Sequence, residues 1–357
     1  MKELIIAEFK DVDSEFPSNI STDMALSNCI KAKSSALAKG DFNAAGQAAK
    51  AAAECYRRIG FSDKAINEQQ TAFALFKETG NRSGALWTKW ANGNLLKQEC
   101  EYTIAIPVFR TTYIHALSIK DYHCAAYSYA GLAETTRIQG FYQPSFAQHL
   151  YALKTFRSLK DYRGIVWAYG GLAQMYKNCG KLRNAFELFD ISRTIAEESS
   201  NMLGLGYALR GVGEVQGFGN SILKGMHHLN IALSIFRLKR LPQGEAYVQK
   251  SLGDINLRRE YIELSIQSYQ NALGLFRQIN DQRGIAFTLK GMGDVQRRLG
   301  LFDEAIDLYR NCYTFFKAKG IEYGVQISSI ALASLGVIDR KSWEKPDSST
   351  ISFFNNY

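Results

Sequence analysis

Proline is scarce in this chain of 357 residues, which carries five prolines beside 29 glycines. Because proline breaks helices and isolated glycines commonly end them, this composition favours long helices separated by glycine turns over a sandwich or a barrel. No run approaches the roughly 18 apolar residues of a membrane-spanning helix, and the apolar stretch after Met1 is too short for a secretory signal. We therefore expect a cytoplasmic protein with no membrane partner.

Cysteine and histidine form no recognisable metal-binding pattern. The six cysteines occur singly and never as C-x-x-C, which excludes the usual zinc spacings and fits a reducing compartment better than a disulfide framework. The five histidines include no H-E-x-x-H sequence, the pattern of helical zinc sites. We therefore expect neither a metal ion nor a cofactor.

The motifs of nucleotide binding and of nucleophilic catalysis are missing as well. The glycine-rich stretch from Gly211 to Gly219 has Gln216 where a dinucleotide-binding fingerprint needs glycine, and no phosphate-binding loop or G-x-S-x-G sequence occurs. Acids such as Glu134 and Glu214 have an arginine one helical turn away, which keeps them ionised and makes them poor proton donors. We predict no catalytic residues and favour a non-catalytic protein, with an enzyme as an alternative.

What the sequence does contain is a repeat with a period of about 40 residues. A turn position is mostly glycine: Gly60, Cys100, Gly140, Gly180, Asn220, Glu260 and Gly300. Another recurring position, at the start of each unit, holds a small residue: Gly84, Cys124, Gly164, Gly204, Gly244, Gly284 and Gly324. A further recurring position, near the end of the second helix, is phenylalanine or alanine: Phe76, Ala116, Phe156, Ala196, Phe236, Phe276 and Phe316. Since apolar residues recur at three- and four-residue spacing in between, each unit is predicted to be a pair of helices.

These units resemble the tetratricopeptide repeat (TPR) family. The small, aromatic and alanine positions of that family are matched three times: by Gly253, Ser265, Tyr269 and Ala272, by Gly293, Ala305, Tyr309 and Cys312, and by Ala173, Tyr176, Ala185 and Phe189. The family standard is about 34 residues long with a proline after the second helix, whereas lysine or arginine stands at that place here, as in Arg157 and Lys317. The 40-residue form is similar to the repeats of Pins-type polarity adaptors and to the TPR arrays of bacterial regulators.

The resemblance implies an all-α, right-handed α-solenoid of about seven TPR helix pairs, with an extra N-terminal helix and a C-terminal capping helix. We expect a single solenoid over residues 23–340, preceded by an acidic arm at 1–22 and followed by a polar and aromatic tail at 341–357. The in-register units are expected near 44–80, 84–120, 124–160, 164–200, 204–240, 244–280 and 284–320, with the cap at 324–339. The acidic arm, or alternatively the aromatic tail, is a candidate to occupy a basic groove when no partner is bound.

In the resembling family, five positions of each unit face the concave groove: the second, fifth, ninth, twelfth and thirteenth. With units counted from residue 46 in steps of 40, these positions hold twelve bases and five acids, an excess of seven positive charges within the net +9 of the chain. The first unit places Gln47, Lys50, Glu54, Arg57 and Arg58 there. The candidate ligand- or peptide-binding residues are Trp87, Trp90, Asn94, Lys97, Tyr127, Glu134, Arg137, Trp167, Gln174, Lys177, Tyr207, Arg210, Glu214, Tyr247, Lys250, Asp254, Arg258, Phe287, Lys290, Asp294, Arg297 and Arg298.

Such a groove predicts a non-catalytic scaffold that binds a peptide or a helical segment of a protein partner with acidic and apolar character. A regulator that senses a peptide or a small molecule is the alternative. Nucleic-acid binding would use the bases and the stackable aromatic rings, but it does not explain the acidic ninth position. The carboxylate clamp of chaperone adaptors is absent, because Asn94 is accompanied by Trp90 where the clamp has lysine.

Two local features leave structural interpretations open. The groove aromatics are either contact residues or core residues, and pairs such as Lys250 with Asp254 have the i, i+4 spacing that stabilises a helix by itself. The glycine-rich unit at 204–243 is either a hinge, a place where a ligand approaches the backbone, or a tolerated degenerate repeat.

Overall fold

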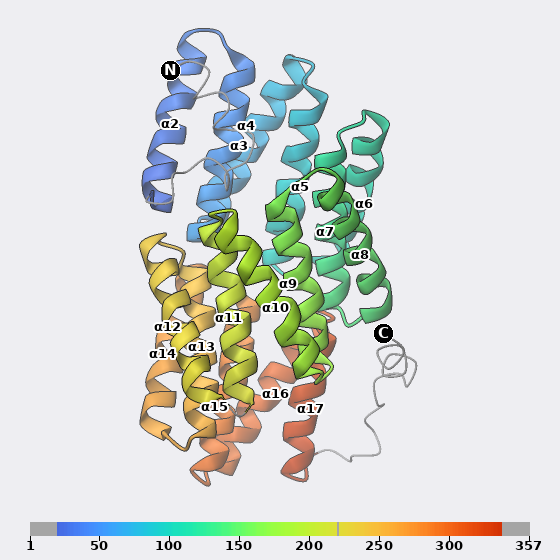
Figure 1. The fold of residues 1–357 in the computed structure, drawn as a ribbon. Coiled ribbons are helices and arrows are strands. Elements are labelled where there is room, and N and C mark those ends of the chain that lie inside the picture. The colour runs from blue at the N-terminus through green and yellow to red at the C-terminus, as the bar shows by residue number, and fades with distance from the viewer. Residues whose placement is uncertain (1–19, 220, 338–357) are drawn as a thin grey trace.

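The computed structural model describes residues 20–219 and 221–337, and all the regular secondary structure in these ranges is α-helical (Figure 1). Asn220, most of the predicted acidic arm and the predicted tail lie outside the described residues. The sixteen described helices are α2 (Thr22–Ala38), α3 (Phe42–Ile59), α4 (Ser62–Glu78), α5 (Arg82–Gln98), α6 (Tyr102–Ser118), α7 (Tyr122–Ile138), α8 (Tyr142–Ser158), α9 (Tyr162–Asn178), α10 (Leu182–Glu198), α11 (Met202–Phe218), α12 (Ile222–Leu238), α13 (Pro242–Arg258), α14 (Ile262–Gln278), α15 (Gln282–Arg298), α16 (Phe302–Ala318) and α17 (Glu322–Ser334). The predicted all-α repeat solenoid is confirmed.

A residue in the left-handed region follows the helices at a regular interval. From residue 40 to residue 320, the residues at intervals of twenty have a positive φ wherever they are described, with values between 49° at Arg240 and 90° at Gly60. At Gly60 the backbone N–H donates to the carbonyl of Arg57 at 3.3 Å, and the N–H of Phe61 donates to the carbonyl of Tyr56 at 2.9 Å. This pair of bonds satisfies the last carbonyls of a helix. Turns within and between units share this geometry, so the backbone period is half of the sequence period.

Aspartate and asparagine side chains start most of the first helices. Each accepts a hydrogen bond of 2.8–2.9 Å from the backbone N–H three residues later, as an N-cap does. At the corresponding place in α13, Leu241 is followed by Pro242, which suits the first turn of a helix without a capping side chain. The sequence prediction missed this recurring signal, which consists of Asp41, Asn81, Asp121, Asp161, Asn201 and Asp281.

The phenylalanine position packs against the glycine that opens the next unit. Phe156 is fully buried, and a Cβ atom added at Gly164 would lie 2.1 Å from its Cδ1 atom. Where Ala116 replaces the phenylalanine, Cys124 replaces the glycine. In the units with phenylalanine the ring therefore requires the small opening residue, whereas Gly204, which follows Ala196, meets Asn201 and Val166 instead. The same close contact occurs in the pairs Phe76–Gly84, Phe236–Gly244, Phe276–Gly284 and Phe316–Gly324.

The aromatic second position also contributes to the core. In four of the five units whose second helix carries phenylalanine, the two rings of the unit lie 4.6–4.9 Å apart between centroids, as for Tyr127 and Phe156; the first unit has Gln47 at the second position. In two units an alanine takes the place of the phenylalanine, and there the larger Trp87 and Trp167 occupy the second position. Both tryptophans pack against the core cluster that contains Tyr127. The aromatic rings of the second position are therefore partly core residues. A larger ring at this position accompanies the smaller alanine in the second helix.

The glycines of the irregular unit let two helices approach closely. A Cβ atom added at Gly225 in α12 would lie 2.6 Å from the backbone nitrogen of Gly217 and 2.7 Å from the carbonyl oxygen of Gly213, both in α11. A Cβ atom at Gly217 would also lie 2.2 Å from the Cδ1 atom of Ile255 in α13. Close helix packing accounts for these glycines without a hinge or a bound ligand.

Successive turns of the solenoid touch, because the described helices wind through more than one superhelical turn. In Figure 1 the helices α2–α4 stand above α12–α14. A Cβ atom added at Gly60 would come within 2.4 Å of the backbone of Ile279. We call this contact between successive turns the seam. It includes three polar contacts between residues 217 or 218 positions apart: Thr22 with Lys239, Asp23 with Arg240, and Glu101 with Lys319.

His149 in α8 is a buried polar residue at a position that is apolar or aromatic in all the other units except the first, which has Gln69. Its ring is fully buried against Gly171, and neither ring nitrogen has a hydrogen-bond partner among the described residues. The corresponding residues of neighbouring units, Phe109 and Phe189, pack against glycine in the same way. Burial lowers the pKa of His149 to about 4, against the smaller opposing influence of Glu134.

We predict that His149→Phe raises the free energy of unfolding by about 1–3 kcal/mol at pH 7, because it removes buried polar atoms that lack partners. The folded imidazole stays neutral below the ordinary histidine pKa, so the wild type loses stability as the pH falls from about 6.5 to 4. The variant should lack that part of the decline. Urea unfolding at several pH values measures both effects, and a destabilised variant would mean that His149 has an unrecognised polar role.

Candidate functional site

The candidate groove residues of separate units face a common interior. The charge of Arg283 in α15 acts on Lys97 in α5, and Tyr207 in α11 acts on Arg57 in α3. The two residues of each pair belong to distant units. Their charges can influence each other only if the first helices of both units direct these side chains into the same space. The ionic side chains of this interior keep between 6% and 24% of their surface accessible. We call this surface the groove.

Glu54 in α3 forms the first charge cluster of the groove. Its Oε1 atom accepts from Arg57 Nη2 at 2.6 Å and from Arg58 Nε at 2.8 Å. Burial alone would raise the pKa of Glu54, but the two guanidinium groups lower it to about 2. Arg57 also donates to the amide oxygen of Gln98 in α5 at 2.7 Å, so the cluster ties two units together.

Glu214 in α11 forms the most buried cluster, with 6% of its side chain accessible. It pairs with Lys177 of the preceding unit and with Arg210 at 2.6 Å, and it accepts from the hydroxyl of Ser251 in the following unit at 2.7 Å. Burial alone would raise the pKa of this carboxyl, yet Arg210, Lys177 and Ser251 hold it well below its usual range. One carboxylate therefore joins three successive units.

The last two clusters are alike. Asp254 pairs with Lys250 at 2.6 Å and accepts from the hydroxyl of Tyr269 at 2.8 Å. At the same position of the next unit, Asp294 pairs with Lys290 at 2.8 Å and its other oxygen accepts from a tyrosine hydroxyl at 2.8 Å. A tyrosine of the second helix is spaced identically from the acid in these two units, whereas the units with glutamate have other residues there. The sequence carried this signal, and the prediction did not use it.

Between these clusters the groove holds aromatic rings and amides. Lys97 donates to the side-chain oxygen of Asn94 at 3.1 Å and lies 5.6 Å from the ring centroid of Trp167, two units away. Trp90 donates its indole N–H to the backbone carbonyl of Tyr127 at 3.1 Å, which fixes that ring. Such rings next to charges offer apolar and polar contacts side by side.

Glu134 and Gln174 make hydrogen bonds within their own helices. Glu134 is bonded by Arg137 at 2.5 and 3.0 Å. Burial alone would raise the pKa of this carboxyl, but Arg137 lowers it strongly. Gln174 donates to Asn178 at 2.9 Å. These side chains are held in place before any ligand arrives.

Three predicted groove residues lie apart from the interior. Arg258, Arg297 and Arg298 are exposed. Arg258 stacks over the ring of Phe218 at 5.2 Å, and Arg298 pairs with Glu260 on the surface at 3.2 Å. These bases therefore lie at the margin of the groove, and less of its positive excess is enclosed than the sequence pattern suggests.

Arg283 is a groove residue that the prediction missed. It precedes the first counted residue of its unit by three positions, outside the five positions taken from the TPR family. Its guanidinium donates to the hydroxyl of Tyr247 at 3.3 Å, and that hydroxyl also lies 3.3 Å from Asp281. The five family positions do not include this one, so the contact of Arg283 with Tyr247 of the preceding unit was found only in the structure.

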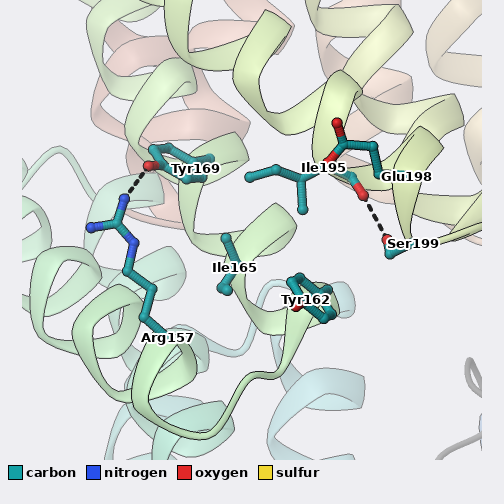
Figure 2. Close-up of a pocket in the computed structure, with 7 residues that line it drawn as sticks. All are labelled: Arg157, Tyr162, Ile165, Tyr169, Ile195, Glu198 and Ser199. Atoms are coloured by element: carbon teal, nitrogen blue, oxygen red, sulfur yellow. Dashed lines mark hydrogen bonds between the residues drawn. The ribbon is translucent and has the colours of Figure 1, made fainter.

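A pocket of about 350 Å³ lies elsewhere, between α8, α9 and α10 (Figure 2). Its lining contains none of the predicted groove residues. Arg157 donates to the hydroxyl of Tyr169, and Ser199 donates to the carbonyl of Ile195 at 2.7 Å, so these polar groups are already engaged. We therefore place the candidate site in the groove. The pocket is lined by Arg157, Tyr162, Ile165, Tyr169, Ile195, Glu198 and Ser199.

The chemistry of the groove is that of fixed charges and hydrogen bonds. Glu54, Glu134 and Glu214 are ionised and held by bases, which suits recognition better than proton transfer. Within residues 20–219 and 221–337, no three histidine, cysteine or acidic side chains cluster as metal ligands would. None of the helices in these ranges is long and apolar enough to span a bilayer.

Known proteins share the fold of this chain. No protein-family model and no curated protein sequence matches it. Among solved structures, it is similar to a Rap protein complexed with competence and sporulation factor, with a TM-score of 0.58 and 11% identity over 87% of this chain and 97% of that chain. It is also similar to the Rap conjugation gene regulator of the plasmid pLS20 in complex with the Phr* peptide, with a TM-score of 0.60 and 13% identity over 83% and 78% of the two chains.

A third similar structure is the apo form of RapI, with a TM-score of 0.51 and 14% identity over 71% of this chain and 98% of that chain. At these identities the likeness concerns the fold alone. Together with the repeating helix pairs, it shows that this chain is a TPR-like helical-repeat solenoid.

Proposed function

We propose that this protein is a non-catalytic, cytoplasmic peptide-binding scaffold of the 40-residue TPR variety, and that its groove is the binding site. The observation that carries the proposal is the ladder of charged side chains along the first helices. Glu54, Glu214, Asp254 and Asp294 occupy the same position of four different units, and each holds at least one base. A row of oriented donors and acceptors suits an extended polar chain better than a compact small molecule.

The ligand is expected to be acidic, with some apolar side chains. Each acid of the groove is already neutralised by at least one base, and further bases such as Lys97 stand beside aromatic rings. Two of the similar structures are complexes, one with competence and sporulation factor and one with the Phr* peptide. That parallel supports a peptide as the ligand class here, whereas the charge of the groove supports its acidic character.

The second candidate function is a sensing regulator, in which a peptide or a small molecule changes the shape of the solenoid. The seam supports it, because exposed ion pairs, Asp23 with Arg240 and Glu101 with Lys319, join successive turns beside the apolar cluster of Cys100 and Phe316. Exposed ion pairs of this kind contribute little stability. A ligand that bridges units inside the groove could therefore shift the spacing of the turns, and solution scattering with and without ligand would detect it.

The test of peptide binding uses paired substitutions that leave the fold intact. Peptides selected from a random library on the wild type should be acidic. Their affinity should fall about tenfold or more in a Lys250→Gln, Lys290→Gln variant, since charged groove contacts are typically worth that much. Tyr269 and Tyr309 still donate to the two aspartates in this variant, so folding should persist.

The matched control removes the same charge from the outside of the solenoid. Arg183 and Arg237 are exposed, with 91% and 57% of their side chains accessible. An Arg183→Gln, Arg237→Gln variant should bind the selected peptides as the wild type does, as measured by fluorescence polarisation. Equal losses in the two variants, or a library that yields no acidic peptides, would contradict the proposal.

A further inference from the structure

Two cations of the groove have no carboxylate within salt-bridge distance among the described residues. Lys97 in α5 donates to the neutral Asn94 at 3.1 Å and faces the ring of Trp167. Arg283 in α15 donates from Nε and Nη2 to the hydroxyl of Tyr247 at 3.3 Å, and Asp281, which accepts from the same hydroxyl, acts on Arg283 electrostatically from beyond salt-bridge distance. Most other groove cations, by contrast, hold a carboxylate or lie at the exposed margin, and Lys50 lies 5.7 Å from the ring centroid of Trp87. Charges enclosed by protein without a counterion are costly.

The seam brings these two cations together. The turn after α5 packs against α15 and α16, where Cys100 and Tyr102 join Ala286 and Phe316 in one core cluster. Lys97 therefore lies near Arg283 although their helices open the second and the seventh units of the repeat.

Further cations surround Lys97. Burial lowers the pKa of Lys97 to about 8; Glu134 opposes this shift, whereas Arg57, Arg283 and Arg137 add to it. The nearby carboxylates, Glu54 and Glu134, are already bonded to Arg57 and Arg137.

We propose that Lys97 and Arg283 form an anion site in the groove that binds a carboxylate group of a peptide ligand. A guanidinium can offer two parallel N–H donors to a carboxylate, and an ammonium beside it adds a further charged donor. The site joins the second and seventh units, so a ligand bound there contacts both sides of the seam. The carboxylate is supplied either by an acidic side chain or by the C-terminus of the peptide. The peptide as the carrier rests on the proposed function; the anion site itself does not.

The free protein should reveal the unpaired charge. Lys97→Met removes it without shortening the side chain much, so the melting temperature of the ligand-free protein should stay the same or rise. The wild type should gain stability as the pH rises from about 8 to about 10.4, because the folded lysine loses its proton before the unfolded one does. The variant should lack this gain. A lower melting temperature in the variant at pH 7 would show that Lys97 is a structural residue, and would overturn the proposal.

Binding is tested with defined probes by isothermal titration calorimetry. The probes are citrate, the peptide acetyl-Ala-Ala-Ala with a free C-terminus, and acetyl-Ala-Glu-Ala with an amidated C-terminus. The neutral control is acetyl-Ala-Gln-Ala amide, at the same ionic strength. We expect the carboxylate probes to bind the wild type at pH 8 with proton uptake, which appears as a dependence of the heat on the buffer. Comparison of the two acidic peptides identifies the source of the carboxylate.

Three variants assign the binding to the site. Lys97→Met and Arg283→Gln should each weaken citrate binding by about tenfold or more, whereas Arg183→Gln, which removes an exposed cation from the outside of the solenoid, should leave it unchanged. Unchanged binding in the first two variants, or no binding of any carboxylate probe to the wild type, would overturn the anion site.

The same measurements separate this inference from the proposed function. If library-selected peptides bind the wild type and Lys97→Met equally well, the groove binds peptides but the anion site is wrong. If citrate binds at Lys97 and Arg283 but no peptide does, the anion site stands, and both its peptide carrier and the proposed function are wrong.

Discussion

Replacing Glu214 by glutamine is expected to lower the free energy of unfolding by about 3–5 kcal/mol, the cost of removing one partner from a buried ion pair. This carboxylate is 6% accessible and is bonded to Lys177, Arg210 and Ser251, which belong to three successive units. Glutamine keeps the shape but leaves two enclosed cations without a counterion. Equilibrium unfolding in urea, followed by far-ultraviolet circular dichroism, measures the loss.

The control for this prediction is Glu187→Gln, which breaks an ion pair on the outside of α10. The side chains of Glu187 and of its partner Arg183 are 56% and 91% accessible, so we expect the free energy of unfolding to change by less than about 0.5 kcal/mol.

The stabilisation by Glu214 should also depend on pH. The pKa of Glu214 in the folded protein lies below its unfolded value, so its contribution to the free energy of unfolding is present above about pH 4.3 and is lost as the pH falls further. A loss for Glu214→Gln no larger than that of the control would mean that solvent in the groove screens the cluster.

Adding one methyl group at Gly164 is expected to destabilise the protein by about 3 kcal/mol, at the upper end of overpacking effects. The new Cβ atom would lie 2.1 Å from the Cδ1 atom of Phe156, whose ring is fully buried and packs on Tyr127. The matched control is Gly170→Ala in the same helix, where a Cβ atom meets nothing within 4 Å. There alanine should stabilise α9 by up to about 1 kcal/mol, because it favours helix more than glycine does.

The contact at Gly164 also predicts strong coupling with its neighbour. Phe156→Ala alone should cost about 3–5 kcal/mol, the usual range for a buried phenylalanine. The double variant should cost less than the sum of the two single variants by about 1–3 kcal/mol, because the methyl group then enters the space the ring has left. The chain already uses this combination of small residues at Ala116 and Cys124. Additive losses in a double-mutant cycle would show that the ring does not set the size of the opening residue.

The sequence by itself determined the repeat and its helices. A left-handed residue recurs at each turn, an aspartate or asparagine often starts the next helix, and a phenylalanine meets the glycine that opens the next unit. These are local rules between residues close together in the chain, so they are visible as columns in one sequence. The charges of the ninth position were visible in the same way, and pairs such as Lys250 with Asp254 follow from helical spacing alone.

The tertiary structure decided which of these residues share a space. The units divide ring volume differently at the core, with Trp167 and Ala196 in one unit and Tyr127 and Phe156 in another. Small rotations accumulate over units, and a contact between the second and seventh units depends on their sum. The seam, the inward turn of Arg283 and its closeness to Lys97 follow from that sum. The charges of the groove are visible in the sequence. No single unit encodes the summed rotation, so only the fold brings Lys97 and Arg283, two cations without a salt bridge, close together.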